Sequence, residues 1–275
     1  MKKFFRCCTV VLGAGLGLLL IAGFVLYVID LQKLTKSYSS LPVEPITIPT
    51  EAAAIARGEH LASTWTCTYC HGEDLRGKLV EDDPFLGTIP ASNLTAGKGG
   101  IAATYTDLDW IRAIRHGVKP DGGVEIMMNN YYVMSDQDLG DLIAYLKQIP
   151  PVDADLPAMH IGPILPLAPA IGYLRPAAER IDYDTPRPAN PIPGATVEYG
   201  AYLSVNCLEC HSSNLSDKLQ GWSQENFFRM MQTGVLPDGQ RLGTGMPLYR
   251  EMNEMELTAL WLYFQTVSAP GESQK

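Results

Sequence analysis

The feature that most constrains this chain is a pattern of two cysteines and a histidine that occurs twice, as CTYCH at 67–71 and as CLECH at 207–211. Residues three and four apart lie on one face of a helical turn, so each pattern presents two thiols and one imidazole to the same side. Two thiols can bond to the two vinyl groups of a haem while the imidazole binds its iron. We therefore expect two covalently bound haem c groups, attached at Cys67, Cys70, Cys207 and Cys210, with His71 and His211 as iron ligands.

Other uses of paired cysteines fit the sequence less well. A four-cysteine zinc site usually has its two CxxC units about 15–20 residues apart, whereas 136 residues separate Cys70 from Cys207. A thioredoxin-like site requires a βαβ setting, which the hydropathy pattern does not indicate. A structural disulfide within each CxxC gives no reason for the histidine that follows. The chain has only five histidines, so chance does not readily place one after both pairs.

Further motifs repeat between the two halves of the chain. SNLT at 92–95 returns as SNLS at 213–216, and GVKPDG at 117–122 returns as GVLPDG at 234–239. Each half ends in a segment with apolar residues at helical spacing, preceded by a polar residue that can cap a helix. Three helix starts carry such a capping signal, at Thr106, Ser135 and Asn253. An internal duplication explains this order of motifs better than convergence does. The copies differ mainly in an insertion at 72–91, which the second copy lacks.

One segment is long and apolar enough to cross a membrane. Residues 9–29 are 21 residues without a charge, which at 1.5 Å per residue matches a hydrocarbon core about 30 Å thick. A cleaved signal peptide would have an apolar region of about 7–15 residues and a small-x-small cleavage site, so we favour an uncleaved anchor. Lys2, Lys3 and Arg6 precede the segment. The positive-inside rule then places the remainder at the periplasmic face of a bacterial inner membrane.

These features predict an all-α protein with an N-terminal transmembrane helix and two tandem haem domains. No segment shows the sustained alternation of a half-buried strand. Residues 150–193 contain eleven of the chain's twenty prolines, which excludes a long helix between the copies. The predicted division is a membrane anchor at 1–36, a spacer at 37–50, the first domain at 51–150, a proline-rich linker at 151–194 and the second domain at 195–269.

A haem that transfers electrons needs a sixth ligand on its iron, such as methionine or histidine. Met246 and Met128 each lie seven residues before the polar residue that caps the last helix of their copy. We expect these two methionines to be the second iron ligands, with Met127 as the alternative to Met128. The other three histidines have no histidine counterpart in the second copy and are expected to be ordinary core or surface residues: His60, His116 and His160.

The charge of the chain bears on its partners. The formal net charge is −9, but residues 1–36 carry +4, which leaves −13 on the remainder. A surface so acidic repels phosphate backbones, which sets nucleic acid aside as a partner. We expect redox protein partners that are basic on the contact face.

With these motifs the chain resembles the membrane-anchored dihaem class I cytochromes c. The resemblance covers about 50–150 and 195–269 and rests on CxxCH, the GV-x-PDG turn and the methionine before a capped helix. It implies a haem fold whose N-terminal helix, here about 51–64, crosses the C-terminal one. It also implies an electron carrier without catalytic residues, acting between a quinol-oxidising complex or dehydrogenase and a terminal acceptor. The family's usual Met-Pro is kept at Met246, whereas Met128 is followed by asparagine.

Two other functions are open at this stage. A dihaem peroxidase would need one iron with an open or displaceable sixth position, and the departure at Met128 leaves room for one. A cytochrome subunit of a larger respiratory oxidase or alcohol dehydrogenase would differ in assembly rather than in chemistry. Peroxide turnover by the purified protein would favour the first, and co-purification with a larger complex would favour the second.

Overall fold

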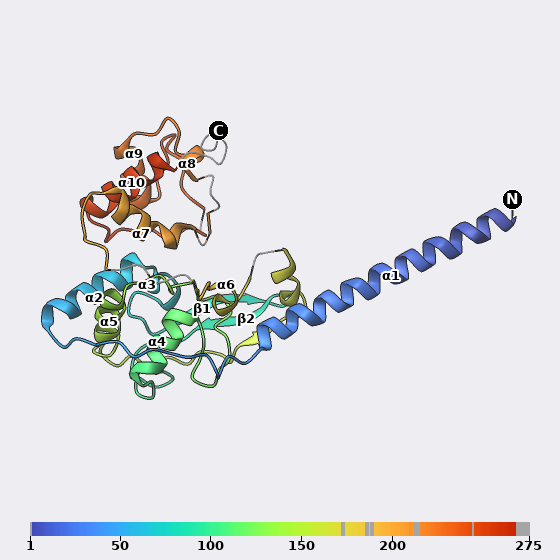
Figure 1. The fold of residues 1–275 in the computed structure, drawn as a ribbon, viewed down its shortest axis with the longest axis horizontal. Coiled ribbons are helices and arrows are strands. Elements are labelled where there is room, and N and C mark those ends of the chain that lie inside the picture. The colour runs from blue at the N-terminus through green and yellow to red at the C-terminus, as the bar shows by residue number, and fades with distance from the viewer. Residues whose placement is uncertain are drawn as a thin grey trace.

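Three parts make up the chain in the computed structural model: a long N-terminal helix and two lobes (Figure 1). The structure describes residues 2–171, 174–184, 187, 190–208, 210–211, 215–243 and 245–267, with side chains from residue 12 onward except at 171. The first lobe follows the long helix and contains a small sheet. The second lobe is built from the C-terminal helices and packs on the first.

The N-terminal helix α1 runs from Lys2 to Thr35 and projects from the first lobe. Within it, Leu12–Thr35 is long and apolar enough to cross a membrane. Leu12 and Leu19 are more than 70% exposed, an arrangement that water disfavours and a lipid bilayer accommodates. The helix joins the lobe at its other end, where Asp30 and Leu34 are buried.

The first lobe contains four helices: α2 (Ala52–Thr64), α3 (Cys67–His71), α4 (Asp107–His116) and α5 (Asp136–Leu146). The expected caps are confirmed. The Thr106 hydroxyl accepts a hydrogen bond from the Asp109 amide at the start of α4, and Ser135 caps α5 in the same way. Helices α2 and α5 cross closely at Gly58, where a Cβ would lie 2.0 Å from the Asp141 carbonyl oxygen.

The second lobe repeats this arrangement. Its helices are α7 (Val197–Leu208), α8 (Leu215–Lys218), α9 (Gln224–Thr233) and α10 (Glu254–Thr266). Helix α7 crosses α10 at Gly200, where a Cβ would lie 2.0 Å from the Ala259 carbonyl oxygen. In both crossings a tyrosine Cβ stands 2.8 Å from where the added Cβ would be, from Tyr145 in the first lobe and from Tyr263 in the second. This equivalence agrees with the internal duplication inferred from the motifs.

The all-α prediction needs correction at the insertion. Strand β1 (Lys78–Asp83) pairs antiparallel with β2 (Gly87–Ala91), and β2 pairs with β3 (His160–Ile161) from the linker. The hairpin turn is held by the Asp83 carboxylate, which accepts hydrogen bonds from the backbone amides of Phe85 and Leu86. Periodicity did not reveal the sheet because β1 is interrupted by a bulge and β3 comes from a distant segment.

The spacer and the linker lie against the first lobe. In the spacer, the Tyr38 amide donates to the Gly122 carbonyl at 2.7 Å. The linker forms two short 3₁₀ turns, η1 (Leu165–Leu167) and η2 (Pro169–Ile171), and a helical turn, α6 (Ala177–Arg180). Leu165 and Ala177 are buried. The expectation that the linker is a connector lying on a folded surface therefore agrees with its described part.

The two lobes meet through equivalent elements. From α2, His60 Nε2 lies 2.7 Å from Glu256 Oε1 at the start of α10. From α7, the Tyr202 hydroxyl donates to Asp138 at the start of α5 and accepts a hydrogen bond from the Ser135 amide at 3.1 Å. Thus the first helix of each lobe bonds to the acidic residue in the first turn of the other lobe's last helix.

We expect the His60–Glu256 contact to weaken as the pH rises. The hydrogen bond to Glu256 raises the pKa of His60 above its ordinary value of 6.5. The stabilisation from the charged pair is therefore fully present below pH 6.5 and is lost as the pH rises through the raised pKa. Because the His60 side chain is 34% exposed, solvent screens the pair and the effect is modest.

The unfolding temperature, followed from acid to alkaline pH, tests this. His60→Gln keeps a hydrogen-bonding group but cannot carry the charge, so the variant should lose the part of the pH dependence that belongs to the pair. His160→Gln is the matched control, because His160 is exposed on β3. Identical pH profiles for His60→Gln and the unmodified chain would show that the pair contributes nothing.

Candidate haem sites

A cavity in the first lobe is lined by all the site residues predicted for the first copy. It encloses about 1350 Å³ of space between atoms, part of it open to solvent. Apolar residues from α4 and α5, including Trp110 and Leu142, form much of the wall. The predicted residues that line it are Cys67, Cys70, His71, Met127 and Met128.

The His71 ring is held in a defined orientation. Its Nδ1 lies 2.7 Å from the Ser92 carbonyl oxygen, and burial lowers the pKa of the imidazole. When Nδ1–H donates to that oxygen, the lone pair on Nε2 is left to bind a metal. Ser92 begins the SNLT motif, and Asn93 anchors the motif by donating to the Val152 carbonyl at 2.8 Å. The repeat of this motif was a sequence signal that it matters. The residue pattern alone did not assign Ser92 as the partner of His71.

The turn that carries the first cysteine pair is strained and braced. Thr66, just before α3, has a φ of 63°, a conformation that costs a residue other than glycine about 1–3 kcal/mol. The buried Tyr131 hydroxyl donates to the Trp65 carbonyl at 2.9 Å and lies 3.3 Å from the Thr66 hydroxyl. Burial raises the pKa of the Cys67 thiol to about 12, so the thiol is neutral before it forms a bond.

Four methionines line the cavity rather than the two that were predicted. Met128 packs against the large core, whereas Met127 packs against a smaller cluster that contains Leu34 of α1. The fully buried Met134 and the linker residue Met159 complete the set. The sequence did not point to Met159 because this residue lies outside the repeated motifs. No local pattern predicts that the following residues, 160–161, pair with β2.

The second site is described in part. Cys207 is buried, Cys210 is exposed and burial lowers the pKa of His211. Met246 is half-buried and packs against the core that the two lobes share. Residues 209, 212–214 and 244 lie outside the described residues, and with them the serine that matches Ser92.

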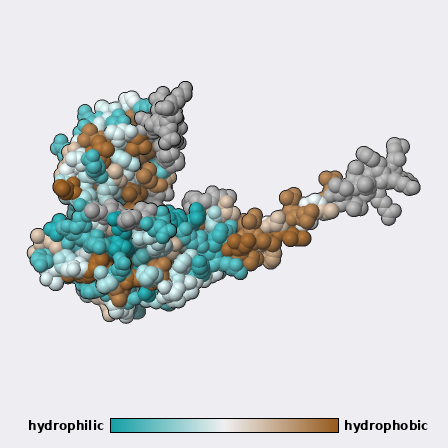
Figure 2. Space-filling view, in the orientation of Figure 1, coloured by the Kyte–Doolittle hydropathy of each residue, from teal (hydrophilic) through white to brown (hydrophobic). Residues whose placement is uncertain are grey.

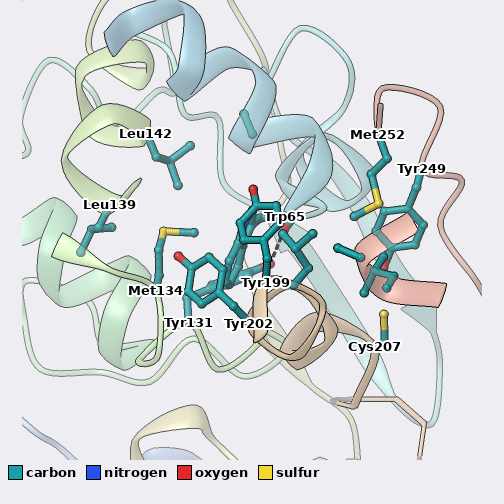
Figure 3. Close-up of a cluster of buried hydrophobic side chains, with 14 of the residues drawn as sticks. Trp65, Tyr131, Met134, Leu139, Leu142, Tyr199, Tyr202, Cys207, Tyr249 and Met252 are labelled. Atoms are coloured by element: carbon teal, nitrogen blue, oxygen red, sulfur yellow. Dashed lines mark hydrogen bonds between the residues drawn. The ribbon is translucent and has the colours of Figure 1, made fainter. Parts of the chain in front are cut away.

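The two CxxCH segments lie close to one another across the lobe interface. Burial is the main cause of the raised pKa of Cys70, and the Cys210 thiol contributes to it. Burial, followed by the nearby Cys207 and Tyr131, likewise raises the pKa of Tyr249. Figure 3 shows the aromatic cluster that fills this interface, with the Trp65 and Tyr202 rings in edge contact at 5.2 Å between centroids.

The residues present fit a covalently bound haem. Among the described cysteines of the two motifs, Cys67, Cys70 and Cys207 are free thiols. Trp110 lines the first cavity, and its buried indole N–H has no hydrogen-bond partner within the part of the chain that the structure describes. An unpaired buried donor in a cofactor cavity suits an anionic acceptor such as a haem propionate. Lys119 also lines this cavity and pairs with Glu125 of the same lining at 3.9 Å.

The other histidines lie elsewhere. His116 is buried and stacks on Tyr183 of the linker, with ring centroids 5.8 Å apart. Burial, followed by nearby arginines, lowers the pKa of His116 to about 4, so the ring is neutral. His60 is at the lobe interface and His160 is on β3. None of the three is among the described residues that line the cavity.

Comparison with known proteins bears on the nature of the first site. Residues 55–150 match the cytochrome c family over a segment that includes most of α2, all of α3 to α5, the β1–β2 hairpin and most of the residues that line the cavity. Over these residues the chain is similar to cytochrome c domains. Such a domain carries covalently bound haem c with its iron, which agrees with the thiols and the imidazole that line the cavity.

Relatives of this chain are named as cytochrome subunits of dehydrogenases. It is 25% identical over 276 residues to the fructose dehydrogenase cytochrome subunit of Gluconobacter japonicus, covering 84% of this chain and 56% of the relative. It is 34% identical over 118 residues to the gluconate 2-dehydrogenase cytochrome c subunit of Pantoea cypripedii, covering 38% and 26%. It is 29% identical over 174 residues to the cytochrome c subunit of the quinone alcohol dehydrogenase of Gluconobacter oxydans, covering 59% and 36%. The chain thus spans about half the length, or less, of these relatives.

Replacing the predicted methionine ligands should change one haem at a time. Met128→Ala should remove the methionine-to-iron charge-transfer band of the first haem, lower its potential and open its iron to carbon monoxide, because alanine offers no ligand. Met246→Ala should do the same for the second haem. Absorption spectra and potentiometric titration measure both effects.

Met127→Ala is the matched control for the first site, because Met127 lines the same cavity as its neighbour. It should leave the charge-transfer band and the potential unchanged. If Met127→Ala removes the band while Met128→Ala leaves it, the assignment of the first sixth ligand is wrong. The same comparison with Met159→Ala tests whether the linker methionine binds the iron instead.

Proposed function

We propose that this chain is a membrane-tethered dihaem c-type cytochrome that transfers single electrons in a respiratory or dehydrogenase-linked chain. The observation that carries the proposal is the proximity of the two CxxCH segments across one shared core. The proposed ligands are His71 and Met128 for the first iron and His211 and Met246 for the second. The proposed division places the two haem domains at 51–150 and 195–269, after an anchor at 1–36 and a spacer at 37–50, with a linker at 151–194.

The protein's contribution is to hold, orient and shield the cofactors. When bound, haem c supplies a reversible one-electron change at its iron. Ser92 orients His71, Tyr131 braces the turn that carries Cys67, and the apolar wall with Trp110 excludes water from the first site. These residues keep the haem ligands in one position whether the iron is oxidised or reduced. None of these roles forms a bond to a substrate.

We propose that the partner is a dehydrogenase and that this chain is its cytochrome subunit. The relatives support this, since each bears the name of a dehydrogenase cytochrome subunit. They do not favour the peroxidase alternative. The formal charge of −13 after residue 36 supports a contact surface on the partner that is basic.

We further propose that α1 crosses the bacterial inner membrane once and leaves both lobes on the periplasmic side. The exposure of Leu12 and Leu19 supports a lipid environment for the helix. Lys2, Lys3 and Arg6 before the apolar stretch support a cytoplasmic N-terminus.

Purification from native membranes in mild detergent tests the assignment as a subunit. The chain should co-purify with a larger dehydrogenase, and addition of that enzyme's substrate should reduce the haems; fructose, gluconate and ethanol are the first substrates to try. The dissociated chain with the same substrate is the control and should remain oxidised. A chain that purifies alone and turns over peroxide would instead support the peroxidase.

A further inference from the structure

A second apolar segment lies beside the point where α1 joins the first lobe. Residues 161–171 of the linker read IGPILPLAPAI, without one charged or polar side chain. The turns η1 and η2 within this segment contact α1, and Leu165 of η1 shares a buried cluster with Leu34 of α1. Figure 1 shows these turns beside the inner end of the helix.

The packing places these turns at the level of the membrane surface. The charge-free stretch of α1 ends at Ile29, and Leu34 lies five residues, or about 8 Å, further along the helix. The headgroup layer on each side of a bilayer is roughly 5–8 Å thick. Protein already covers part of Tyr27 and Val28, before the charge-free stretch ends. Segments packed on α1 between these residues and Leu34 therefore stand within the interfacial layer.

Three large apolar side chains are exposed around this junction. Ile164 is 45% exposed and Leu167 is 42% exposed, although Leu165 between them is only 1% exposed. Phe85, at the turn between β1 and β2, is 59% exposed, and its carbonyl accepts a hydrogen bond from the Ile164 amide at 2.9 Å. We name Phe85, Ile164 and Leu167 the junction patch.

The Asp83 carboxylate beside Phe85 is already engaged. Asp83 Oδ1 accepts hydrogen bonds from the Phe85 amide at 2.8 Å and the Leu86 amide at 2.9 Å. Its charge is thereby partly compensated by the turn that it holds. In the space-filling view, the apolar surface of α1 continues to the edge of the first lobe (Figure 2). Tyr27 is a residue of the kind that favours the interface between lipid and water.

We infer that the junction patch inserts into the lipid headgroup region and gives the first lobe a second contact with the bilayer. The inference rests on the proposed crossing of the membrane by α1. Burial of exposed Phe, Ile and Leu side chains beside an existing anchor is favourable because the anchor has already removed most of the freedom that binding would cost. Two residues close in sequence to the patch line the first haem cavity, Ile89 on β2 and Met159 just before β3. The contact therefore holds that cavity at one height and orientation above the membrane.

Carbene labelling from within the lipid tests this inference. The full haem-loaded chain is placed in nanodiscs whose lipid carries a photoactivatable diazirine on its acyl chain, and labelled residues are located by mass spectrometry. Ile164 and Leu167 should be labelled several-fold more than Ile192, an apolar residue that is 86% exposed but lies outside the patch. Leu20 of α1, 67% exposed, is the control for the membrane crossing.

The outcomes separate the two proposals. Labelling of Leu20 with Ile164 and Leu167 at the level of Ile192 would overturn the inference and leave the crossing in place; the patch would then be a site for a protein. Absence of labelling at Leu20 would refute the crossing and the inference together. The double variant Ile164→Ser with Leu167→Ser, at exposed positions that folding tolerates, should lower labelling of Phe85 and leave Leu20 unchanged. Unchanged labelling of Phe85 would show that the three residues do not act as one patch.

Discussion

A chain with Cys67→Ser and Cys70→Ser is expected to retain one covalent haem, whereas we expect the unmodified chain to carry two. The serine hydroxyl does not form the thioether bond that holds haem c, so the loss at that site should be complete. Cys207→Ser with Cys210→Ser should remove the other haem, and the four substitutions together should leave none. Haem per chain, measured after acid-acetone extraction of denatured protein, reads out the count directly.

The same experiment contains its own control. Cys7→Ser with Cys8→Ser changes the two cysteines outside the CxxCH motifs and should leave both haems in place. Recovery of two covalent haems from the Cys67 and Cys70 variant would overturn the assignment of the first site. Recovery of zinc in place of haem from the unmodified chain would overturn both.

Loss of the first haem should also destabilise the first lobe. Its cavity wall consists mainly of apolar side chains, among them Trp110, Ile114 and Leu142, which lose their packing partner when the space is not filled. The second lobe should then unfold at a separate and higher temperature.

Gly58→Ala and Gly200→Ala are expected to produce the second large effect, a loss of stability. Each added Cβ would lie 2.0 Å from a backbone carbonyl oxygen of the crossing helix, a position that no side-chain movement can relieve. The helices must separate, and forcing extra volume into a packed contact typically costs about 1–3 kcal/mol, occasionally more. Unfolding by denaturant, followed by circular dichroism, measures the loss.

Gly194→Ala is the control for these substitutions, because its Cβ would meet its nearest neighbour at 3.5 Å, an ordinary contact. Where the backbone tolerates it, replacement of glycine by alanine stabilises a protein by about 0.4–1 kcal/mol. Gly58→Ala and Gly200→Ala should therefore move in the direction opposite to Gly194→Ala. Equal stability for all three variants would show that the crossings have room to adjust.

Local signals in the sequence were sufficient for the helices and for most of the first site. The caps at Thr106, Ser135 and Asn253 form as the spacing indicated, because a cap depends on residues within one turn. The CxxCH spacing likewise brings Cys67, Cys70 and His71 to one cavity wall.

Features that depend on distant segments could not be read in this way. Strand β3 is supplied by residues 160–161, far along the chain from its partner β2, and no local pattern specifies such a pairing. Met159 reaches the cavity wall because it precedes that strand. His60 has an ordinary sequence context, and its bond to Glu256 arises only when the two lobes meet. Tertiary packing thus supplied the partners that periodicity and motifs left unassigned.

The contact between the lobes has the geometry of a symmetric association. In a dimer of identical subunits, residue i of one copy meets residue j of the other and the reverse also holds. His60 with Glu256 and Tyr202 with Asp138 occupy these two reciprocal positions. Two copies on separate chains would have to share every residue, and their two iron centres would be equivalent. Because the two copies lie on one chain, each can change its sequence independently. The His60–Glu256 contact can therefore titrate with pH, while Tyr202 in the other contact stays neutral. Through the same freedom, the potentials of the two proposed haems can differ from one another.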